Sequence, residues 1–258
     1  MVVLSYLKRV CLEKGAGYLA LLDPDKLSGP SLVKAAVRCQ ENGADALLIG
    51  SSLMFTADFD DAVRRVKQEV EIPVILFPGA SHHLSRHADA LLFLSLLSGR
   101  NPQYLIGEQV RSAPIIQAFG LEPIATGYLL IESGSVTSAE FTSDTRPIPR
   151  DKPSIAVAHA LAAEYLGMRL VYLEAGSGAR YSVPDELVRM VCQAVSIPVI
   201  AGGGIREPQV AAEKVKAGAS FVVTGNILEE NASAQLIQEF ADAIHTARSR
   251  ASDAESCG

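Results

Sequence analysis

The chain has 258 residues, of which 48% are hydrophobic and 20% charged, a composition that allows a full core and excludes an intrinsically disordered protein. Its formal net charge of −6 argues against a nucleic-acid-binding protein, although a local site can still hold an anionic small molecule. The longest apolar stretch, Ala88–Leu97, is far shorter than the ~20 residues that a membrane-spanning helix needs.

Short apolar runs alternate with amphipathic stretches of helical periodicity along the whole chain. The predicted strands are Tyr18–Leu22, Ala46–Ile49, Val74–Phe77, Ala90–Leu94, Ile124–Leu130, Leu170–Leu173, Val199–Ala201 and Phe221–Thr224. The predicted helices are Ser31–Asn42, Asp58–Val70, Pro102–Phe119, Ser154–Leu166, Pro184–Val195, Pro208–Ala217 and Ala232–Arg248. Because the strands are apolar throughout, we expect a parallel sheet covered by helices.

Eight such strands favour a closed (β/α)₈ TIM barrel, an α/β fold, over an open Rossmann sheet. Internal echoes support repeated βα units, since residues 71–75 resemble 196–200 and residues 43–51 resemble 218–226. No linker divides the chain. We therefore predict a single domain over residues 1–250 and a disordered tail over 251–258.

The end of the first predicted strand carries Asp23 and Asp25, which strand alternation places on one face. Gly50-Ser51-Ser52 ends the second strand next to it. Carboxylates and hydroxyls at a barrel mouth suit Mg²⁺, which shares its shell with substrate phosphates and water. The alternative, a role in turn formation or helix capping, is credible for Asp25 and less so for Asp23, which is still attached to the strand.

The third connection, Pro78–Ala88, has little helical periodicity, so its helix is predicted to be missing or reduced to a turn. His82, His83 and His87 cluster there. Their spacing imitates a metal site, but no cysteine or acid completes it, and we favour a solvated loop.

After the fifth strand, which carries Tyr128, residues 132–153 are rich in Ser, Thr, Gly and Pro. A long polar loop inside a compact domain is usually functional or mobile, and this one follows a C-terminal strand end, where barrel active sites lie. For Tyr128, a place in the wall of the barrel and a functional role are both open.

The last three strands each end in glycine-bearing turns: Gly176-Ser177-Gly178, Gly202-Gly203-Gly204 and Gly225-Asn226. A phosphate needs several backbone N–H groups aimed at one spot, and a Cβ would hinder their approach. One such turn could simply be tight, but three in succession favour a phosphate-binding cup. Glu174 heads the first turn, where it could orient or deprotonate a substrate hydroxyl.

These segments together resemble the geranylgeranylglyceryl phosphate synthase and heptaprenylglyceryl phosphate synthase family, in matching order from Asp23 to Asn226. The resemblance is carried by Leu22-Asp23-Pro24-Asp25-Lys26, Ile49-Gly50-Ser51-Ser52, Thr126-Gly127-Tyr128, Tyr172-Leu173-Glu174-Ala175-Gly176-Ser177-Gly178, Gly202-Gly203-Gly204-Ile205 and Gly225-Asn226. It implies a modified TIM barrel that has lost its third helix.

The resemblance also implies the site. Asp23 and Ser52 would hold Mg²⁺, and Glu174 would address the glycerol hydroxyls, with Tyr128 as a second catalytic candidate. The residues implied to bind sn-glycerol 1-phosphate are Tyr172, Leu173, Glu174, Ala175, Gly176, Ser177, Gly178, Gly203, Gly204, Gly225 and Asn226. Some members have a lysine two residues before the metal-binding aspartate; here that position is Leu21, which points to the branch that lacks it.

The implied reaction is Mg²⁺-dependent ether formation between the 3-hydroxyl of sn-glycerol 1-phosphate and a polyprenyl diphosphate, most simply geranylgeranyl diphosphate, in ether-lipid biosynthesis. The prenyl tail needs an apolar trench, for which the candidates are Leu53, Met54, Phe55, Phe77, Leu96 and Leu97. The competing functions are another phosphate-binding barrel enzyme, such as a phosphosugar isomerase or lyase, and a non-catalytic barrel protein. Asp23 beside Ser52, and Glu174, argue against them.

The resemblance implies a homodimer or larger assembly and peripheral contact with a membrane, since donor and product are lipid-like, while the net charge argues against a nucleic-acid partner. The four cysteines, Cys11, Cys39, Cys192 and Cys257, form no Cys-x-x-Cys pair, so we expect reduced thiols and a cytoplasmic location. The amphipathic residues Met1–Lys14 do not form a signal peptide pattern.

Overall fold

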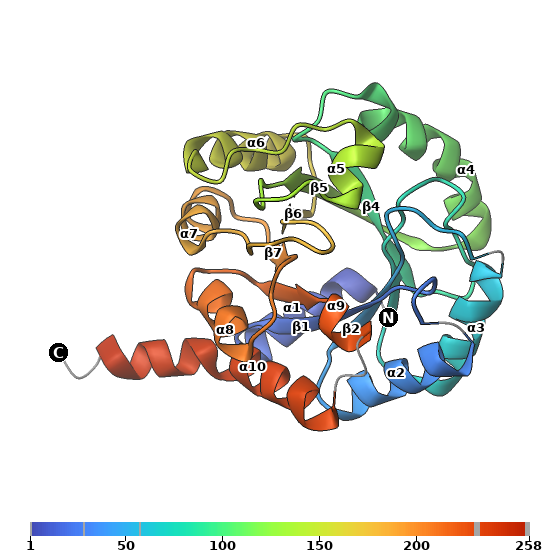
Figure 1. The fold of residues 1–258 in the computed structure, drawn as a ribbon, viewed down its shortest axis with the longest axis horizontal. Helices are drawn as coiled ribbons and strands as arrows, with labels where there is room; N and C mark the ends of the chain where they lie inside the picture. The colour runs from blue at the N-terminus through green and yellow to red at the C-terminus, as the bar shows by residue number, and fades with distance from the viewer. Residues whose placement is uncertain (1, 28, 57, 230–232, 256–258) are drawn as a thin grey trace.

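The fold is that of a computed structural model, which describes residues 2–27, 29–56, 58–229 and 233–255. Within these residues, eight parallel strands form a closed barrel in chain order, each pairing with the next and β8 pairing with β1 (Figure 1). The strands are β1 (Gly17–Leu22), β2 (Ala46–Ile49), β3 (Val74–Leu76), β4 (Ala90–Leu96), β5 (Glu122–Leu130), β6 (Leu170–Glu174), β7 (Val199–Gly202) and β8 (Phe221–Thr224). The predicted TIM barrel is confirmed.

Helices surround the strands: most form an outer ring, whereas α1 lies across one end of the barrel (Figure 1). They are α1 (Val3–Lys14), α2 (Pro30–Glu41), α3 (Phe59–Glu69), η1 (Gln103–Gly107), α4 (Glu108–Phe119), α5 (Ser138–Ser143), α6 (Pro153–Tyr165), α7 (Asp185–Ala194), α8 (Pro208–Lys216), α9 (Asn226–Glu229) and α10 (Ala234–Glu255). Prolines occupy the first turn of α2, α6 and α8, where the missing N–H costs nothing.

The third connection lacks a helix, as predicted: residues 77–89, all of which the structure describes, contain only turns and bends. Three elements were not predicted. These are α1 and the short helices α5 and α9. Residues 251–255, expected to be a disordered tail, continue α10 instead, and 256–258 lie outside the described residues. A run of Ala, Ser, Asp and Glu without Gly or Pro does not by itself end a helix.

The N-terminal end of the barrel is closed by α1. Val3, Leu4 and Leu7 pack into the cluster of side chains that fills the barrel interior, together with Tyr172 and Phe221. The backbone N–H of Leu4 donates to Glu122 Oε1 at 3.1 Å, which satisfies part of the first turn of α1. A ligand can therefore reach the barrel only from the carboxyl ends of its strands.

A buried carboxylate, Asp45, ties this lower end together. Its oxygens accept from Tyr18 N at 2.7 Å, pair with Lys14 Nζ at 2.6 Å and contact His245 Nε2 at 2.8 Å. Burial raises the pKa of Asp45, but the contacts with His245, Lys14 and Tyr18 outweigh it and hold the pKa below its ordinary value. Asp45 thereby joins α1, β1 and α10.

In the described part of the chain, no helix is both long enough and apolar enough to cross a membrane.

Candidate functional site

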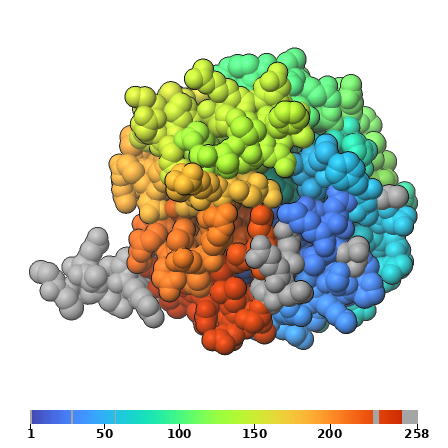
Figure 2. Space-filling model, viewed as in Figure 1, coloured from blue at the N-terminus to red at the C-terminus, as the bar shows by residue number. Residues whose placement is uncertain are grey.

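A cavity of about 330 Å³ opens among the carboxyl ends of the strands. Figure 2 shows this face hollowed between the blue segment after β2, the yellow-green segment after β5 and the orange loops after β6 to β8. Of the residues implicated by the sequence, the cavity is lined by Asp23, Ser52, Tyr128, Tyr172, Glu174, Gly176, Ser177, Gly178, Gly203, Gly204, Gly225 and Asn226. Leu173 and Ala175 do not line it, because their side chains pack in the layer between the strands and the helices.

One side of the cavity is built from backbone. Gly203 has φ +79°, and a Cβ added to it would lie 2.2 Å from Glu174 Oε1 and 2.7 Å from Gly176 N. Only glycine allows the loops after β6 and β7 to approach so closely. Ser177 Oγ donates to Asn226 Oδ1 at 3.2 Å and links the loops after β6 and β8.

The same loops present hydrogen-bond donors to the cavity. Among the hydrogen bonds within the described residues, none uses the backbone N–H of Ser177, Gly178, Gly203 or Gly204. All four residues line the cavity. Several N–H groups that converge without protein acceptors form a nest for an anion such as phosphate. We call these turns after β6, β7 and β8 (residues 176–178, 203–204 and 225–226) the phosphate-binding side.

Glu174 lies at the floor of this side and is only 5% exposed. Its Oε1 accepts the N–H of Gly176 at 2.6 Å. Burial raises the pKa of Glu174 above its ordinary value, against smaller opposing contributions from Gly176 and Tyr172. A buried carboxyl with a raised pKa is a stronger base than an exposed one when ionised.

Three aromatic rings line the centre of the cavity. Phe77 and Tyr172 stack with centroids 5.4 Å apart, and Tyr128 meets Tyr172 edge-on at the same distance. Burial raises the pKa of both tyrosines well above the ordinary value, so their rings stay neutral. The Tyr172 hydroxyl is buried near the Glu174 carboxylate but makes no hydrogen bond of good geometry within the described residues, which leaves a polar group for a ligand.

The opposite side of the cavity carries Asp23. Its Oδ1 accepts from Asp25 N at 2.9 Å, and its Oδ2 accepts from Ser51 Oγ at 3.1 Å. The hydroxyl that touches Asp23 thus belongs to Ser51 rather than to the predicted Ser52, which lines the same cavity one residue further on. We call Asp23 with residues 50–56 the metal-binding side.

Asp25 has the structural role that was its alternative. Its carboxylate accepts the backbone N–H groups of Phe55 at 2.8 Å and Thr56 at 2.7 Å, as well as the Thr56 hydroxyl. Burial raises its pKa, but these bonds outweigh it and lower the pKa overall. Asp25 therefore anchors the segment after β2.

Among the described residues, the oxygen donors on this side of the cavity fit Mg²⁺. Asp23 offers a carboxylate and the serines offer hydroxyls, all hard oxygen ligands, facing a cavity with room for a substrate phosphate and water. No cluster of three or more His, Cys, Asp and Glu is found among the described residues.

A second, apolar cavity of about 110 Å³ lies beside the first where the third helix is missing. Ser51, Ser52, Phe77 and Tyr128 line both cavities. Of the predicted trench residues, Phe77 and Leu96 line the second cavity and Leu53 and Phe55 the first, whereas Met54 and Leu97 pack into the core. The sequence analysis missed Leu84, Leu91, Leu92, Phe93, Leu94, Tyr104 and Ala139. The absent helix was the signal that could have located them.

The predicted functional loop after β5 is ordered by α5 and by a bridge between Ile131 and Ile148. Thr142 and Ser143 line the apolar cavity and Ser138 the larger one. Leu21 and Lys26 also line the larger cavity, so the position where some family members carry lysine is part of the site.

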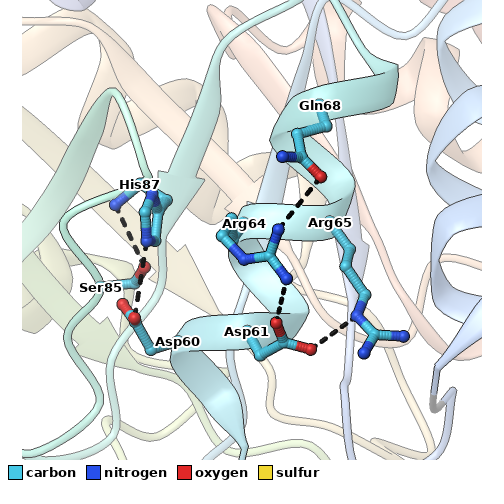
Figure 3. Close-up of polar contacts among 7 residues, drawn as sticks. All are labelled: Asp60, Asp61, Arg64, Arg65, Gln68, Ser85 and His87. Carbon is cyan, nitrogen blue, oxygen red and sulfur yellow. Dashed lines mark hydrogen bonds and ion pairs between the residues drawn. The ribbon is translucent and has the colours of Figure 1, made fainter.

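The three histidines of the third connection lie in three different environments. His87 faces α3, with Nε2 3.6 Å from Asp60 Oδ2, as Figure 3 shows. His82 is exposed, while His83 is 3% exposed. The predicted solvated loop is wrong for His83, because its ring is packed against Phe59 and His82.

The model of the PcrB family matches residues 8–244. A geranylgeranylglyceryl phosphate synthase of Chitinophaga pinensis is 45% identical over 230 residues, 89% of this chain and 90% of the relative. One of Pyrococcus horikoshii is 44% identical over 234 residues, 90% of this chain and 91% of the relative. The crystal structure of (S)-3-O-geranylgeranylglyceryl phosphate synthase from Thermoplasma acidophilum in complex with its substrate sn-glycerol-1-phosphate has a TM-score of 0.89 at 35% identity, covering 95% of this chain and 99% of that one.

Proposed function

The chain belongs to the PcrB family, and from that premise we propose that it is a prenyltransferase that joins geranylgeranyl diphosphate to sn-glycerol 1-phosphate through an ether bond. Two relatives at 44–45% identity carry the name geranylgeranylglyceryl phosphate synthase. A similar solved enzyme is described with sn-glycerol-1-phosphate as its substrate. The activity belongs to ether-lipid biosynthesis.

The acceptor occupies the phosphate-binding side. The unused N–H groups of Ser177, Gly178, Gly203 and Gly204 hold its phosphate. Glu174 lies on the same side and accepts a hydrogen bond from a glycerol hydroxyl. Holding phosphate and hydroxyl at once fixes the nucleophile, which replaces a bimolecular encounter by an oriented one.

The donor occupies the metal-binding side and the apolar cavity. Asp23, Ser51 and Ser52, which line the cavity, would supply oxygen ligands for Mg²⁺. When bound, Mg²⁺ would neutralise charge that develops on the leaving diphosphate. The tail runs past Phe77 and Tyr128 into the apolar cavity between β3, β4 and α4.

In the transfer, the 3-hydroxyl oxygen forms a bond to C1 of the prenyl chain while the bond between C1 and the diphosphate oxygen breaks. The electron pair leaves with diphosphate. The hydroxyl proton passes to a carboxylate oxygen of Glu174, whose raised pKa suits it to accept the proton. The faces of Phe77, Tyr128 and Tyr172 stabilise the positive charge at the allylic C1, as aromatic rings do for cations.

The observation that carries this proposal is the junction of the two cavities. Phosphate and metal-binding sides face each other across one space, and that space continues into an apolar cavity through Phe77 and Tyr128. A phosphosugar isomerase or lyase has no use for the apolar extension.

The experiment is to incubate the protein with sn-glycerol 1-phosphate, Mg²⁺ and prenyl diphosphates of C10 to C35, and to measure product and released diphosphate. We expect turnover, with C20 preferred. Absence of turnover with every donor would reject the assignment. The stereoisomer sn-glycerol 3-phosphate serves as the matched acceptor control.

We also propose a cytoplasmic protein that contacts membranes at the barrel mouth and assembles into dimers or larger oligomers. Within the described residues, Cys11, Cys39 and Cys192 are thiols rather than halves of a disulfide, which suits a reducing compartment. Large apolar side chains are exposed in segments that follow β2 and β5, namely Leu53, Phe55, Val136 and Phe141, and such side chains favour a lipid surface. Co-sedimentation with vesicles and light scattering test the two parts separately.

A further inference from the structure

The segment that carries Ser51 and Ser52 is held from two directions. On the β1 side, the Asp25 carboxylate binds Phe55 N and Thr56 N. On the β3 side, the backbone of Gly79 lies against it: a Cβ at Gly79 would be 2.6 Å from the carbonyl oxygen of Ser51 and 2.7 Å from that of Ser52. The backbones of the two loops are thus in close contact at Ser51 and Ser52, whose side chains line the cavity.

The contact that holds Gly79 comes from a side chain. Gly79 N donates to Nδ1 of His83 at 3.2 Å, and His83 N donates to the carbonyl of Ala80 at 3.1 Å. The ring is 3% exposed and packed between Phe59 of α3 and His82, so it has little freedom to move. Phe59 of α3 thus holds the ring from outside the loop, while Ala80 and His82 hold it from within the loop.

The protonation state of the ring is compatible with this bond. Nδ1 can accept from Gly79 only in the neutral ring with its proton on Nε2. Burial lowers the pKa of His83 to about 4, with a further lowering from His82 and opposing effects from Asp25 and Glu108. The ring is therefore neutral at physiological pH.

We propose, on the basis of the function inferred above, that His83 is a positioning residue for the metal-binding side: by accepting the Gly79 N–H it keeps residues 77–83 against the carbonyls of Ser51 and Ser52 and so sets their hydroxyls for the metal-bound diphosphate. The phosphate-binding side lies across the cavity on β6 to β8 and does not depend on this contact. His83 therefore acts on one substrate and not on the other.

The test uses two variants that differ in one acceptor atom. Asn in His83→Asn can place Oδ1 near the position of Nδ1, whereas His83→Leu has a similar volume and no acceptor. Calorimetry would measure binding of Mg²⁺ with inorganic diphosphate, and separately of sn-glycerol 1-phosphate, to each folded variant. Hydrogen exchange of residues 50–56 in the free protein gives a readout that does not need catalysis. His87→Asn, in the same connection but facing Asp60, is the matched control.

For His83→Leu we expect affinity for Mg²⁺ and diphosphate to fall about tenfold, as for loss of a partly buried hydrogen bond, with faster exchange over residues 50–56. Acceptor affinity should change less than twofold, and His83→Asn should recover most of the loss. Unchanged diphosphate affinity in His83→Leu, or an equal loss for both ligands, would overturn the proposal.

If His83→Leu does not fold, His83→Gln replaces it, because its Oε1 reaches the position of Nε2 and not that of Nδ1. Retained diphosphate affinity in His83→Gln would then count against the proposal, and loss with recovery in His83→Asn would support it. A failed prenyltransfer assay with altered exchange over residues 50–56 would reject the proposed function while leaving the contact between His83 and that segment intact.

Discussion

The two sides of the site differ in whether backbone or side-chain groups form them. The phosphate-binding side is backbone: glycine turns after β6, β7 and β8 line the cavity, and four of their N–H groups make no hydrogen bond within the described residues. The metal-binding side is made of side chains on a segment that is held in place by contacts from β1 and β3 loops. A backbone nest is fixed by local conformation, whereas a side-chain ligand set depends on how neighbouring loops pack.

This difference predicts that damage to the metal-binding side should affect catalysis most. Asp23→Ala removes the carboxylate ligand, and with it the stabilisation of the leaving diphosphate. We expect kcat to fall by about a thousandfold or more, while the circular dichroism spectrum and acceptor affinity stay unchanged. Near-normal turnover in Asp23→Ala would refute the role of Asp23 as a metal ligand. It would also remove the proposed difference between the two sides.

Glu174→Gln tests the one side chain that the phosphate-binding side contributes to the chemistry. It retains an acceptor oxygen but cannot take a proton, so we expect kcat to fall about a hundredfold, with acceptor KM changed only a few-fold. The rate of the parent enzyme should rise with pH through the raised pKa of Glu174 and then level off, because only the ionised form accepts the proton. A pH–rate profile that keeps this rise in Glu174→Gln would assign it to another group.

Gly203→Ala sharpens the distinction between backbone and side chain. The added Cβ would lie 2.2 Å from Glu174 Oε1 at a φ of +79°, so the loop must shift and the nest must open. Acceptor affinity should fall about tenfold or more, with binding of Mg²⁺ and diphosphate unchanged. Calorimetry measures the affinity for each ligand separately. Equal losses of affinity for the acceptor and for Mg²⁺ with diphosphate would show that the two sides are not independent.

Asp45→Asn should leave both sides intact and so have the smallest effect on turnover. It removes a buried charge that pairs with Lys14 and His245, and we expect a loss of about 2 kcal/mol or more in the free energy of unfolding. Because the pKa of Asp45 is lowered by folding, its contribution is present above the ordinary carboxyl pKa and is lost as pH falls through the lowered value. Urea denaturation at neutral and acidic pH measures this effect. The difference in the free energy of unfolding between the parent and Asp45→Asn should become smaller as pH falls.

Sequence reasoning was strongest where function resides in backbone. Glycines at three consecutive strand ends located the turns that line one side of the cavity. The alternation of elements predicted the barrel, and the weak helical periodicity of residues 78–88 predicted its missing helix. It was weaker where side chains from distant segments meet. Nothing in the spacing of Asp23, Ser51 and Ser52 shows which hydroxyl reaches the carboxylate, and nothing local in His83 shows that its ring is buried against Phe59 of α3. Burial of Leu173 and Ala175 likewise depends on which face of β6 meets α6 and α7.

The missing third helix has a thermodynamic consequence. In the free protein, Leu91 and Phe93 of β4 line a cavity on the side of the strand that a helix would cover in a complete barrel. A prenyl chain that fills this space supplies the apolar cover in place of the helix. Ligand occupancy and folding stability are then linked, so the donor should raise the melting temperature and give a negative heat capacity change on binding. The polar acceptor buries little apolar surface, so its effects on the melting temperature and the heat capacity should be far smaller.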